Sequence, residues 1–319
     1  MNVRETARWL RERDHYLILT HKRPDGDTIG SAVGLCQMLR ELGKTAWLLE
    51  SQDVGASLRG YLEGYVAPPD YVPHTVVSTD VATADLLPPN AAPYVGRIDL
   101  AIDHHRSHRS FAALECLDFD RAATGEIIWE LCRELGQASA AIATPLYVAV
   151  STDCGCFVYS NTTPDTHRVA AELMEQGIPY QEMNRRHFRT RSMARLRLEG
   201  LVLSEVELLY GGKLAVASVP LSMMERAQAT EDDAEDLAAL PGQIEGTFGS
   251  VLIRELKEGG CKVSVRTRPD WLDANAVCTR MGGGGHPAAS GCTVRGDMAY
   301  TRTEVLHAVA AQLQGDPPL

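Results

Sequence analysis

The feature that most constrains the fold is a polar stretch at residues 20–31, which directly follows an apolar run at residues 16–19. The stretch contains a proline and a glycine that favour a turn, because proline fixes φ and glycine permits positive φ. A turn after a buried strand places its polar side chains at the carboxyl edge of a sheet, where ligands bind in open α/β folds. Three such side chains follow the strand here, His21, Asp25 and Asp27.

Two interpretations of this stretch are open. Imidazole combined with carboxylate oxygens suits a divalent ion such as manganese. Alternatively, the stretch is an Asp-rich turn that caps a helix beginning near Thr28, which is a common position for aspartate. The stretch alone does not decide between a metal site and a helix cap, so the rest of the chain must.

Composition narrows the class of protein. A length of 319 residues is typical of two domains, and 45% hydrophobic with 23% charged residues is typical of a globular chain. The longest apolar run is far shorter than the ~20 residues of a membrane span, and the N-terminus has no apolar signal region. Eight cysteines without a Cys-x-x-Cys pair indicate reduced, buried thiols. We therefore expect a cytoplasmic protein that does not associate with membranes.

The net charge of −11 argues against a protein that coats long nucleic acid, which would need a basic surface. It does not exclude a short anionic ligand, because metal ions within a cluster of carboxylates reverse the local sign of the field. The oligomeric state is not determined by the sequence, and a homodimer stays open.

Strands and helices alternate in the first part of the chain, which predicts an α/β fold with a parallel sheet and helices on both faces. The predicted strands lie at residues 15–20, 44–50, 75–79 and 97–102. The predicted helices lie at residues 3–13, 28–42, 123–135, 139–152 and 165–177.

The chain changes character after a helical, arginine-rich segment at residues 181–207. Predicted strands at 213–219, 246–255 and 261–267 and a final helix at 303–313 indicate a second, smaller α/β domain. We therefore divide the chain into a first domain at residues 1–185, a helical connector at 186–210 and a second domain at 211–319.

Ligands for a hard metal ion recur at the ends of predicted strands and helices. Besides the first stretch, they are Asp80, the sequence Asp103-His104-His105, and Asp153. A single strand-end aspartate is usually structural, and the two histidines could belong to a surface loop. Because parallel strands end at the same edge of a sheet, however, these side chains are expected to converge. The pattern favours a metal centre over a set of unrelated caps.

These motifs resemble the DHH phosphoesterase superfamily, named for Asp103-His104-His105. The first motif matches as His21-x-x-Pro24-Asp25-Gly26-Asp27 and the fourth as Thr152-Asp153-Cys154-Gly155. Residues 282–286, with residues 264–267 upstream, are similar to the DHHA1 substrate domain. The two-domain layout most resembles the NrnA-type nanoRNases of this superfamily.

The resemblance implies two manganese ions, for which magnesium or cobalt are alternatives. One ion would bind His21, Asp25 and Asp80, and the other would bind Asp27, Asp80, His104 and Asp153. Asp103 would orient an imidazole from outside the metal shell, and His105 would face the scissile phosphate. Two ions ~4 Å apart lower the pKa of a water and polarise phosphoryl oxygens.

The glycine run in the second half has two interpretations. Four consecutive glycines are entropically costly, so they indicate a backbone that closely approaches another group. A flexible linker is the alternative, which Pro287 makes less attractive. The resemblance implies that Gly283, Gly284, Gly285 and His286, together with Arg266, bind the far end of the substrate. Arginine suits bidentate phosphate recognition, and a fixed distance from the metals would select short substrates.

The implied function is a manganese-dependent phosphodiesterase that hydrolyses oligoribonucleotides of two to a few nucleotides to mononucleotides. Phosphatase activity on 3′-phosphoadenosine 5′-phosphate would accompany it. Alternatives are a phosphodiesterase for cyclic or linear signalling dinucleotides, a RecJ-like single-strand exonuclease, and a nucleotide-binding regulator without activity. The complete set of ligands speaks against the regulator.

Three positions depart from the common pattern of the superfamily. His108 stands where many relatives have asparagine, and we assign it no role. Val158 lies where some relatives place a basic residue, so phosphate contacts on that side are open. Cys154 replaces the more usual threonine, and we interpret it and Cys156 as small core residues rather than ligands.

Overall fold

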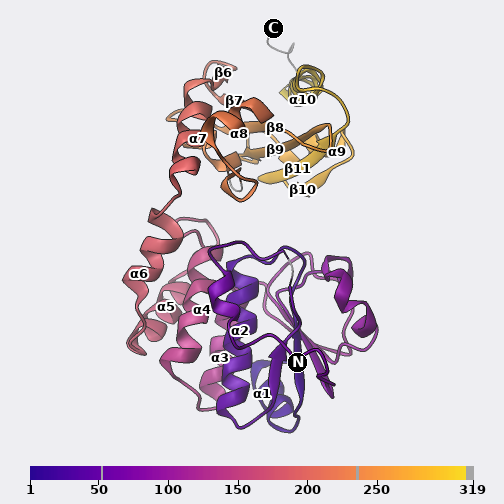
Figure 1. Ribbon diagram of the computed structural model, residues 1–319, viewed down its shortest axis with the longest axis vertical. Coiled ribbons are helices and arrows are strands. Elements are labelled where there is room, and N and C mark those ends of the chain that lie inside the picture. Colours follow the sequence, from indigo (N-terminus) through magenta and orange to yellow (C-terminus); the bar gives the residue numbers. More distant parts are fainter. Residues whose placement is uncertain (52, 235–236, 314–319) are drawn as a thin grey trace. The chain divides into compact units, whose positions relative to one another are not determined.

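The computed structural model describes residues 1–51, 53–234 and 237–313 (Figure 1). The chain forms two compact units, Met1–Thr190 and Arg191–Leu319, and the division falls inside the arginine-rich segment. Among the described helices, none has both the length and the apolar character needed to cross a membrane. Each unit has its own sheet and its own hydrophobic core.

The sheet of the first unit is entirely parallel, with strand order β2-β1-β3-β4-β5. Its strands are β1 (Tyr16–Leu19), β2 (Ala46–Leu48), β3 (Thr75–Thr79), β4 (Leu100–Asp103) and β5 (Leu114–Leu117). The chain moves to one side of β1 to form β2 and then to the other side to form β3. In open α/β sheets ligands bind where the strand order reverses in this way, which here is at the carboxyl ends of β1 and β3.

Helices cover both faces of this sheet, as expected, but they differ in kind (Figure 1). The α-helices of the unit are α1 (Val3–Arg11), α2 (Gly26–Glu41), α3 (Thr124–Glu134), α4 (Ala140–Asp153), α5 (Pro164–Glu175) and α6 (Tyr180–Asn184). The short 3₁₀ and π segments are η1 (Arg59–Leu62), η2 (Ala84–Leu86), η3 (Pro89–Tyr94) and η4 (Arg185–Arg189). The main core lies between α1–α4 and the sheet, whereas η2 and η3 help to cover the opposite face.

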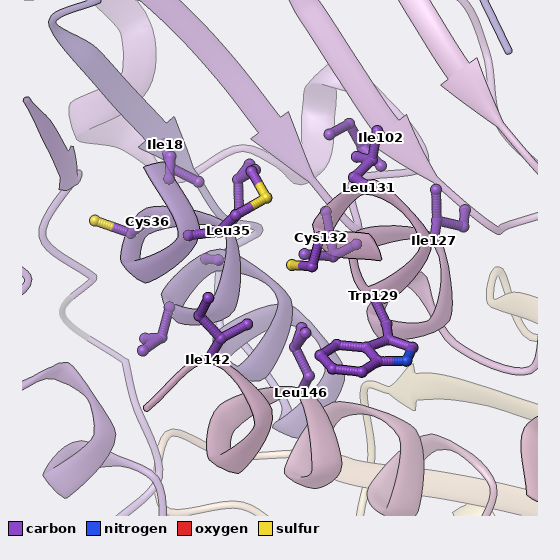
Figure 2. Close-up of a cluster of buried hydrophobic side chains, with 14 of the residues drawn as sticks. Ile18, Leu35, Cys36, Ile102, Ile127, Trp129, Leu131, Cys132, Ile142 and Leu146 are labelled. Carbon is purple, nitrogen blue, oxygen red and sulfur yellow. The ribbon is translucent and has the colours of Figure 1, made fainter. Parts of the chain in front are cut away.

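Residues of β1 alternate between the two cores, as the two-residue period of a strand requires. Ile18 faces the helices and Leu17 faces the other side, and all four residues of β1 are buried. Figure 2 shows the helical side, where Leu35 of α2, Trp129 of α3 and Leu146 of α4 gather beneath the sheet. Burial on both faces accounts for the continuous apolar run in the sequence.

Helices α2 and α4 lie unusually close together because α2 presents a stripe of glycines to α4. A Cβ atom on Gly30 would lie 2.3 Å from the carbonyl oxygen of Pro145, and one on Gly34 would lie 2.5 Å from the Leu146 side chain. At Gly26, one helical turn before Gly30, a Cβ atom would lie 2.2 Å from Oγ1 of Thr152. The stripe therefore brings the start of α2 against the end of α4.

The second unit contains a mixed six-stranded sheet of order β10-β11-β9-β8-β7-β6. Its strands are β6 (Glu207–Leu209), β7 (Leu214–Val219), β8 (Gly249–Glu255), β9 (Cys261–Thr267), β10 (Gly284–His286) and β11 (Ala289–Val294). Its helices are α7 (Met193–Ser204), α8 (Leu221–Ala227), α9 (Ala274–Thr279) and α10 (Met298–Leu313), with the 3₁₀ turns η5 (Asp232–Ala234), η6 (Leu237–Ala239) and η7 (Pro241–Gln243). Among the strands that the structure describes in this sheet, β7 and β8 are the pair that runs in parallel.

The two faces of this second sheet are covered unequally. Helices α9 and α10 pack on one face, and α7 and α8 pack on the β7–β8 part of the other. On the rest of that second face, over β9, β11 and β10, the side chains are polar or small and half-buried or exposed. No α-helix among the described residues of the second unit packs on this part of the sheet, which we call its uncovered part and which carries Ser264, Arg266 and His286.

The structure corrects several of the predicted elements. The strands at 75–79 and 261–267 are confirmed with the predicted bounds, whereas the final helix begins earlier, at Met298. Residues 181–207 do not form one helix, because the chain is extended at Thr190 and Ser192. Strands β5, β6, β10 and β11 and helices α8 and α9 were not predicted.

Candidate metal centre

The predicted ligands of the first unit meet at the carboxyl edge of its sheet. His21 follows β1, Asp80 follows β3, and His104 follows β4. Asp27 lies in the first turn of α2, and Asp153 is the last residue of α4, which the glycine stripe of α2 holds nearby. The site therefore sits at the point where the strand order reverses.

Asp25 both caps a helix and borders the site. Its side chain accepts a hydrogen bond from the backbone N–H of Thr28 at 3.0 Å, so the capping interpretation holds. The same carboxylate lies 4.0 Å from Nε2 of His21. A cap and a ligand are compatible because a carboxylate has two oxygens and about four lone pairs.

Asp27 is fixed by the first residues of α3. It accepts hydrogen bonds from the backbone N–H groups of Thr124 at 2.7 Å and Gly125 at 3.0 Å, and from the Ser31 hydroxyl at 2.8 Å. Free backbone N–H groups at a helix start favour a negative charge. Asp27 is 1% exposed, so these donors hold a buried carboxylate in one orientation.

Asp80 adopts a backbone conformation that is rare for residues with a side chain. Its φ is +59°, in the left-handed region, and only 2% of the residue is exposed. The hydroxyl of Thr28 lies 2.7 Å from one of its oxygens and 2.5 Å from Nε2 of His21, and the hydroxyl of Thr124 donates to the other oxygen at 3.0 Å. Strained residues persist where the surroundings determine them and are concentrated at functional sites. Both oxygens of Asp80 face the centre of the cluster.

Two histidines direct a nitrogen lone pair into the cluster. Nδ1 of His21 lies 2.9 Å from the carbonyl oxygen of Lys22, and Nδ1 of His104 lies 3.1 Å from that of Arg121. Because a carbonyl only accepts hydrogen bonds, each Nδ1 carries a proton, which leaves Nε2 as the ligand atom. A second-sphere carbonyl of this kind is the usual orienting partner of a metal-binding imidazole.

The donor atoms form three overlapping groups, in each of which all atoms lie within 4.8 Å of one another. The groups are His21, Asp25 and Asp80; Asp27, His104 and Asp153; and Asp80, His104 and His105. Nε2 of His104 lies 3.5 Å from Asp153, 3.6 Å from Asp80 and 3.7 Å from Asp27. Asp80 and His104 therefore link the groups, and all six predicted ligands lie in one continuous site.

The electrostatics of the site favour cations. Burial and the neighbouring carboxylates of Asp80, Asp153 and Asp25 hold the pKa of Asp27 well above its usual range. Burial likewise raises the pKa of Asp153 to about 6, against the opposing effect of His104. Four carboxylates thus lie close together, and the neighbouring side chains supply too little positive charge to neutralise them. Oxygen and imidazole donors in this number fit divalent ions such as manganese.

Asp103 and His105 form a pair beside this cluster. The fully buried Asp103 accepts a hydrogen bond from Nδ1 of His105 at 2.8 Å. Although burial opposes it, the hydrogen bonds from His105 and His108 hold the pKa of Asp103 below its usual range. Burial would lower the pKa of His105, but Asp103 and the charge of Asp80 raise it to about 9. The His105 side chain is 37% exposed, so a protonated imidazole borders the solvent-facing side of the site.

Sequence reasoning missed the residues that hold the ligands. Thr28 and Thr124 connect Asp80 to the starts of two helices, and no motif singled them out. The spacing of Gly26, Gly30 and Gly34 was the available signal for the contact of α2 with α4. Small residues at every fourth position form one helix face and permit such close packing.

The predicted substrate-binding residues lie in the second unit, on the uncovered part of its sheet. His286 pairs with Ala289 of β11, and Ala289 pairs with Arg266 of β9. Cross-strand partners face the same side of a sheet, so Arg266 and His286 share one face at about 10 Å, two strand spacings. Gly284 stands in the next row of that face, opposite Gly291.

The glycine run is explained in part by contacts within the unit. A Cβ atom on Gly283 would lie 2.3 Å from the Cβ of Cys292, and one on Gly285 would lie 2.6 Å from the Ser290 hydroxyl. The close approach predicted for these glycines is therefore, at these two positions, an approach to β11. His286 itself is exposed.

Comparison with known proteins places these features in a family. Residues 15–150 match the DHH family, N-terminal domain, and residues 211–315 match the DHHA1 domain. A protein of Thermus thermophilus named bifunctional oligoribonuclease and PAP phosphatase NrnA is 38% identical over 303 residues, which are 93% of this chain and 89% of that protein. The Bacillus subtilis protein of the same name is 26% identical over 91% of this chain and 92% of its own length.

Solved structures share the fold. An exopolyphosphatase-related protein from Bacteroides fragilis superposes with a TM-score of 0.89 at 23% identity, over 98% of this chain and 96% of that one. An exonuclease RecJ solved with manganese bound superposes with a TM-score of 0.53 at 14% identity, over 99% of this chain and 95% of that one. With both domains matched and a 38% identical relative along nearly the whole length, this chain belongs to the DHH family, with a C-terminal DHHA1 domain.

Proposed function

We propose that this protein is a manganese-dependent phosphodiesterase that hydrolyses oligoribonucleotides of two to a few residues to mononucleotides. We further propose that it removes a phosphate from 3′-phosphoadenosine 5′-phosphate. The observation that carries the proposal is the set of three donor groups joined through Asp80 and His104 at the edge of the sheet. The names of the Thermus and Bacillus relatives support the choice of substrates.

The residues of the metal centre have separate tasks in this proposal. His21 and Asp25 would hold one ion, Asp27, His104 and Asp153 would hold the other, and Asp80 would contribute one oxygen to each. When bound, the two ions supply a water of lowered pKa and neutralise charge that develops on the phosphoryl group. The hydrogen bonds to Asp27 and Asp80 keep these oxygens aimed without further rearrangement.

His105 is the residue proposed to contact the reacting phosphate. Its Nδ1 donates to Asp103, so a proton on Nε2 is the one available to a phosphoryl oxygen or to the leaving oxygen. The hydrogen bond to Asp103 favours the protonated imidazole. A donor held within hydrogen-bond reach of developing charge typically accelerates a reaction by ~10²–10³-fold.

The uncovered sheet face of the second unit is proposed to bind the end of the substrate remote from the scissile bond. Arg266 and His286 supply cationic or hydrogen-bonding groups on one face, and Ala289 between them leaves room for a nucleotide. Arginine binds phosphate through two parallel N–H donors. The partner implied is a short RNA or a dinucleotide rather than a long strand.

A substrate panel tests the proposal. Purified protein with manganese is offered dinucleotides, a 24-mer RNA of about ten times that length, 3′-phosphoadenosine 5′-phosphate and pyrophosphate, and kcat/KM is measured for each. We expect dinucleotides to be the best substrates, with measurable release of phosphate from the bisphosphate. A preference for the long RNA would point to a RecJ-like exonuclease, and turnover of pyrophosphate alone would reject both proposed activities.

A further inference from the structure

The side chain of His108 is buried and makes contacts that the metal centre described above does not use. Its side chain is 2% exposed and lies between two carboxylates. Nδ1 is 2.6 Å from Oδ2 of Asp103, and Nε2 is 3.4 Å from Oε1 of Glu115 on β5. The ring of Phe111 lies beside it, with centroids 5.4 Å apart. An imidazole in this setting is held on three sides.

The contact with Asp103 completes the hydrogen bonding of a buried carboxylate. Oδ1 of Asp103 accepts from the backbone N–H of His104 at 2.9 Å and from both the backbone and Nδ1 of His105. Among the hydrogen bonds of the described residues, Oδ2 has His108 as its side-chain donor. Removing that donor leaves a fully buried oxygen unpaired, so the carboxylate gains a driving force to turn toward another donor against the three hydrogen bonds on Oδ1.

The orientation of Asp103 determines the orientation of His105. The bond from Nδ1 of His105 to Oδ1 of Asp103, at 2.8 Å, decides which ring nitrogen is left for the substrate. A backbone hydrogen bond from the N–H of His108 to the carbonyl of His105, at 3.0 Å, closes the turn that returns His108 to Asp103. The three side chains therefore form one chain of hydrogen bonds, which Glu115 extends toward the outer strand of the sheet.

We propose that His108 is a positioning residue: by fixing the rotamer of Asp103, it fixes the direction in which His105 presents Nε2 to the phosphate. This proposal rests on the proposed function, because it assigns a role within the same reaction. His108 does not touch the substrate, and its contribution belongs to kcat rather than to substrate binding. Loss of a residue that orients a functional side chain without touching the substrate typically lowers activity by ~10–100-fold.

Two substitutions separate this role from simple packing. His108→Asn keeps an N–H donor on a short side chain that reaches toward Asp103, whereas His108→Leu keeps the volume and removes the donor. We expect His108→Leu to lower kcat on a dinucleotide by ~10–100-fold with KM within about 2-fold, and His108→Asn to recover most of the loss. The control is His74→Leu. His74 directly precedes β3, at the amino-terminal ends of the strands of the same sheet, so this substitution should leave kcat and KM unchanged.

A second measurement does not depend on activity. In metal-free protein, the Nδ1–H proton of His105 is followed by ¹⁵N-edited NMR of the imidazole groups. A proton in the bond to Asp103 exchanges slowly, and we expect rapid exchange in His108→Leu and slow exchange in His108→Asn. Wild-type exchange and wild-type kcat in a folded His108→Leu variant would overturn the proposal, as would a loss that His108→Asn fails to recover.

The two measurements distinguish failure of this proposal from failure of the proposed function. If the wild-type protein hydrolyses none of the nucleotides in the panel, the proposed function fails. The NMR comparison still decides whether His108 holds Asp103 and His105 in place. If the panel is turned over as expected and exchange is the same in all variants, only the role of His108 is rejected.

Discussion

The two units differ in how deeply their candidate functional residues are buried. In the first, Asp27, Asp80 and Asp103 are at most 2% exposed, and each carboxylate has a hydrogen-bond partner at both oxygens. In the second, His286 is exposed and Arg266 is half-buried on an uncovered sheet face. Chemistry on a phosphate requires donors that are fixed before the substrate arrives. In the proposed function the second unit binds the variable end of a short chain, which requires an accessible surface.

The largest effect is expected from Asp80→Asn. Asparagine tolerates the left-handed backbone of this position, so the substitution removes charge with little strain. We expect kcat to fall by at least about 10³-fold, with loss of bound manganese measured by elemental analysis. The matched control is Asp85→Asn, an exposed aspartate on the same segment, which should behave as wild type. A manganese content and kcat near wild type would remove Asp80 from the centre.

The next effect is expected from Gly30→Ala on α2. The new methyl group would lie 2.3 Å from the Pro145 carbonyl, so α2 and α4 must separate. Overpacking of this kind costs ~1–3 kcal/mol, and a 1 Å displacement of Asp27 from Asp153 would lower kcat/KM by ~10²-fold. Gly200→Ala is the control, because a Cβ there meets no atom within 4 Å. Gly200→Ala should stabilise α7 by ~0.5–1 kcal/mol. If Gly30→Ala and Gly200→Ala had equal activity and equal stability, the packing argument would be contradicted.

A smaller effect is expected from Arg266→Ala in the second unit. If this face only binds, KM for a dinucleotide should rise by about 10-fold, the value of one charged hydrogen bond, while kcat stays within about 2-fold. Arg268→Ala provides the comparison, since Arg268 is a nearby exposed arginine that pairs with Asp270 at 2.9 Å. A fall in kcat without a change in KM would show that the division of tasks between the units is wrong.

The smallest effect is expected in the stability of the metal-free protein. The pKa of Asp153 is raised to about 6, above its value of ~3.9 in an unfolded chain. Between those values the folded protein binds more protons, so its free energy of unfolding decreases as pH rises from about 4 to 6. Removing the charge with Asp153→Asn should raise Tm by ~2–6 °C at pH 7.5 relative to wild type.

The same comparison near pH 4 serves as the internal control, because there the wild-type carboxyl is largely protonated and the difference should vanish. Saturating manganese should reverse the order at pH 7.5, since it stabilises only the protein that retains the ligand. A constant Tm difference at both pH values would argue that Asp153 does not repel its neighbours.

Three of the candidate ligands could be predicted to be neighbours because each follows a buried apolar strand. Parallel strands end at one edge, so His21, Asp80 and His104 had to be neighbours once the strands were identified. The supports could not be predicted in the same way. Thr28 and Thr124 are ordinary helix-start residues, and only the fold shows that both reach Asp80.

Strands β10 and β11 escaped prediction for a different reason. Glycine, alanine and serine have low intrinsic strand propensity, and residues 282–291 contain little else. Their strand conformation comes from tertiary packing, with Gly283 against Cys292 and Gly285 against Ser290. His108 was passed over because asparagine is the usual residue there, although its spacing from the two preceding histidines was visible in the sequence.

The glycine stripe of α2 has a consequence for how this site could change over time. The separation of Asp27 from Asp153 depends on atoms that Gly26, Gly30 and Gly34 do not have. A lineage, or a designer, can therefore retune the spacing between ligands without replacing any of them, by adding a methyl group about two helical turns away at Gly34. In the proposed metal centre, selectivity among divalent ions of different radius becomes adjustable from a residue that is not itself a ligand.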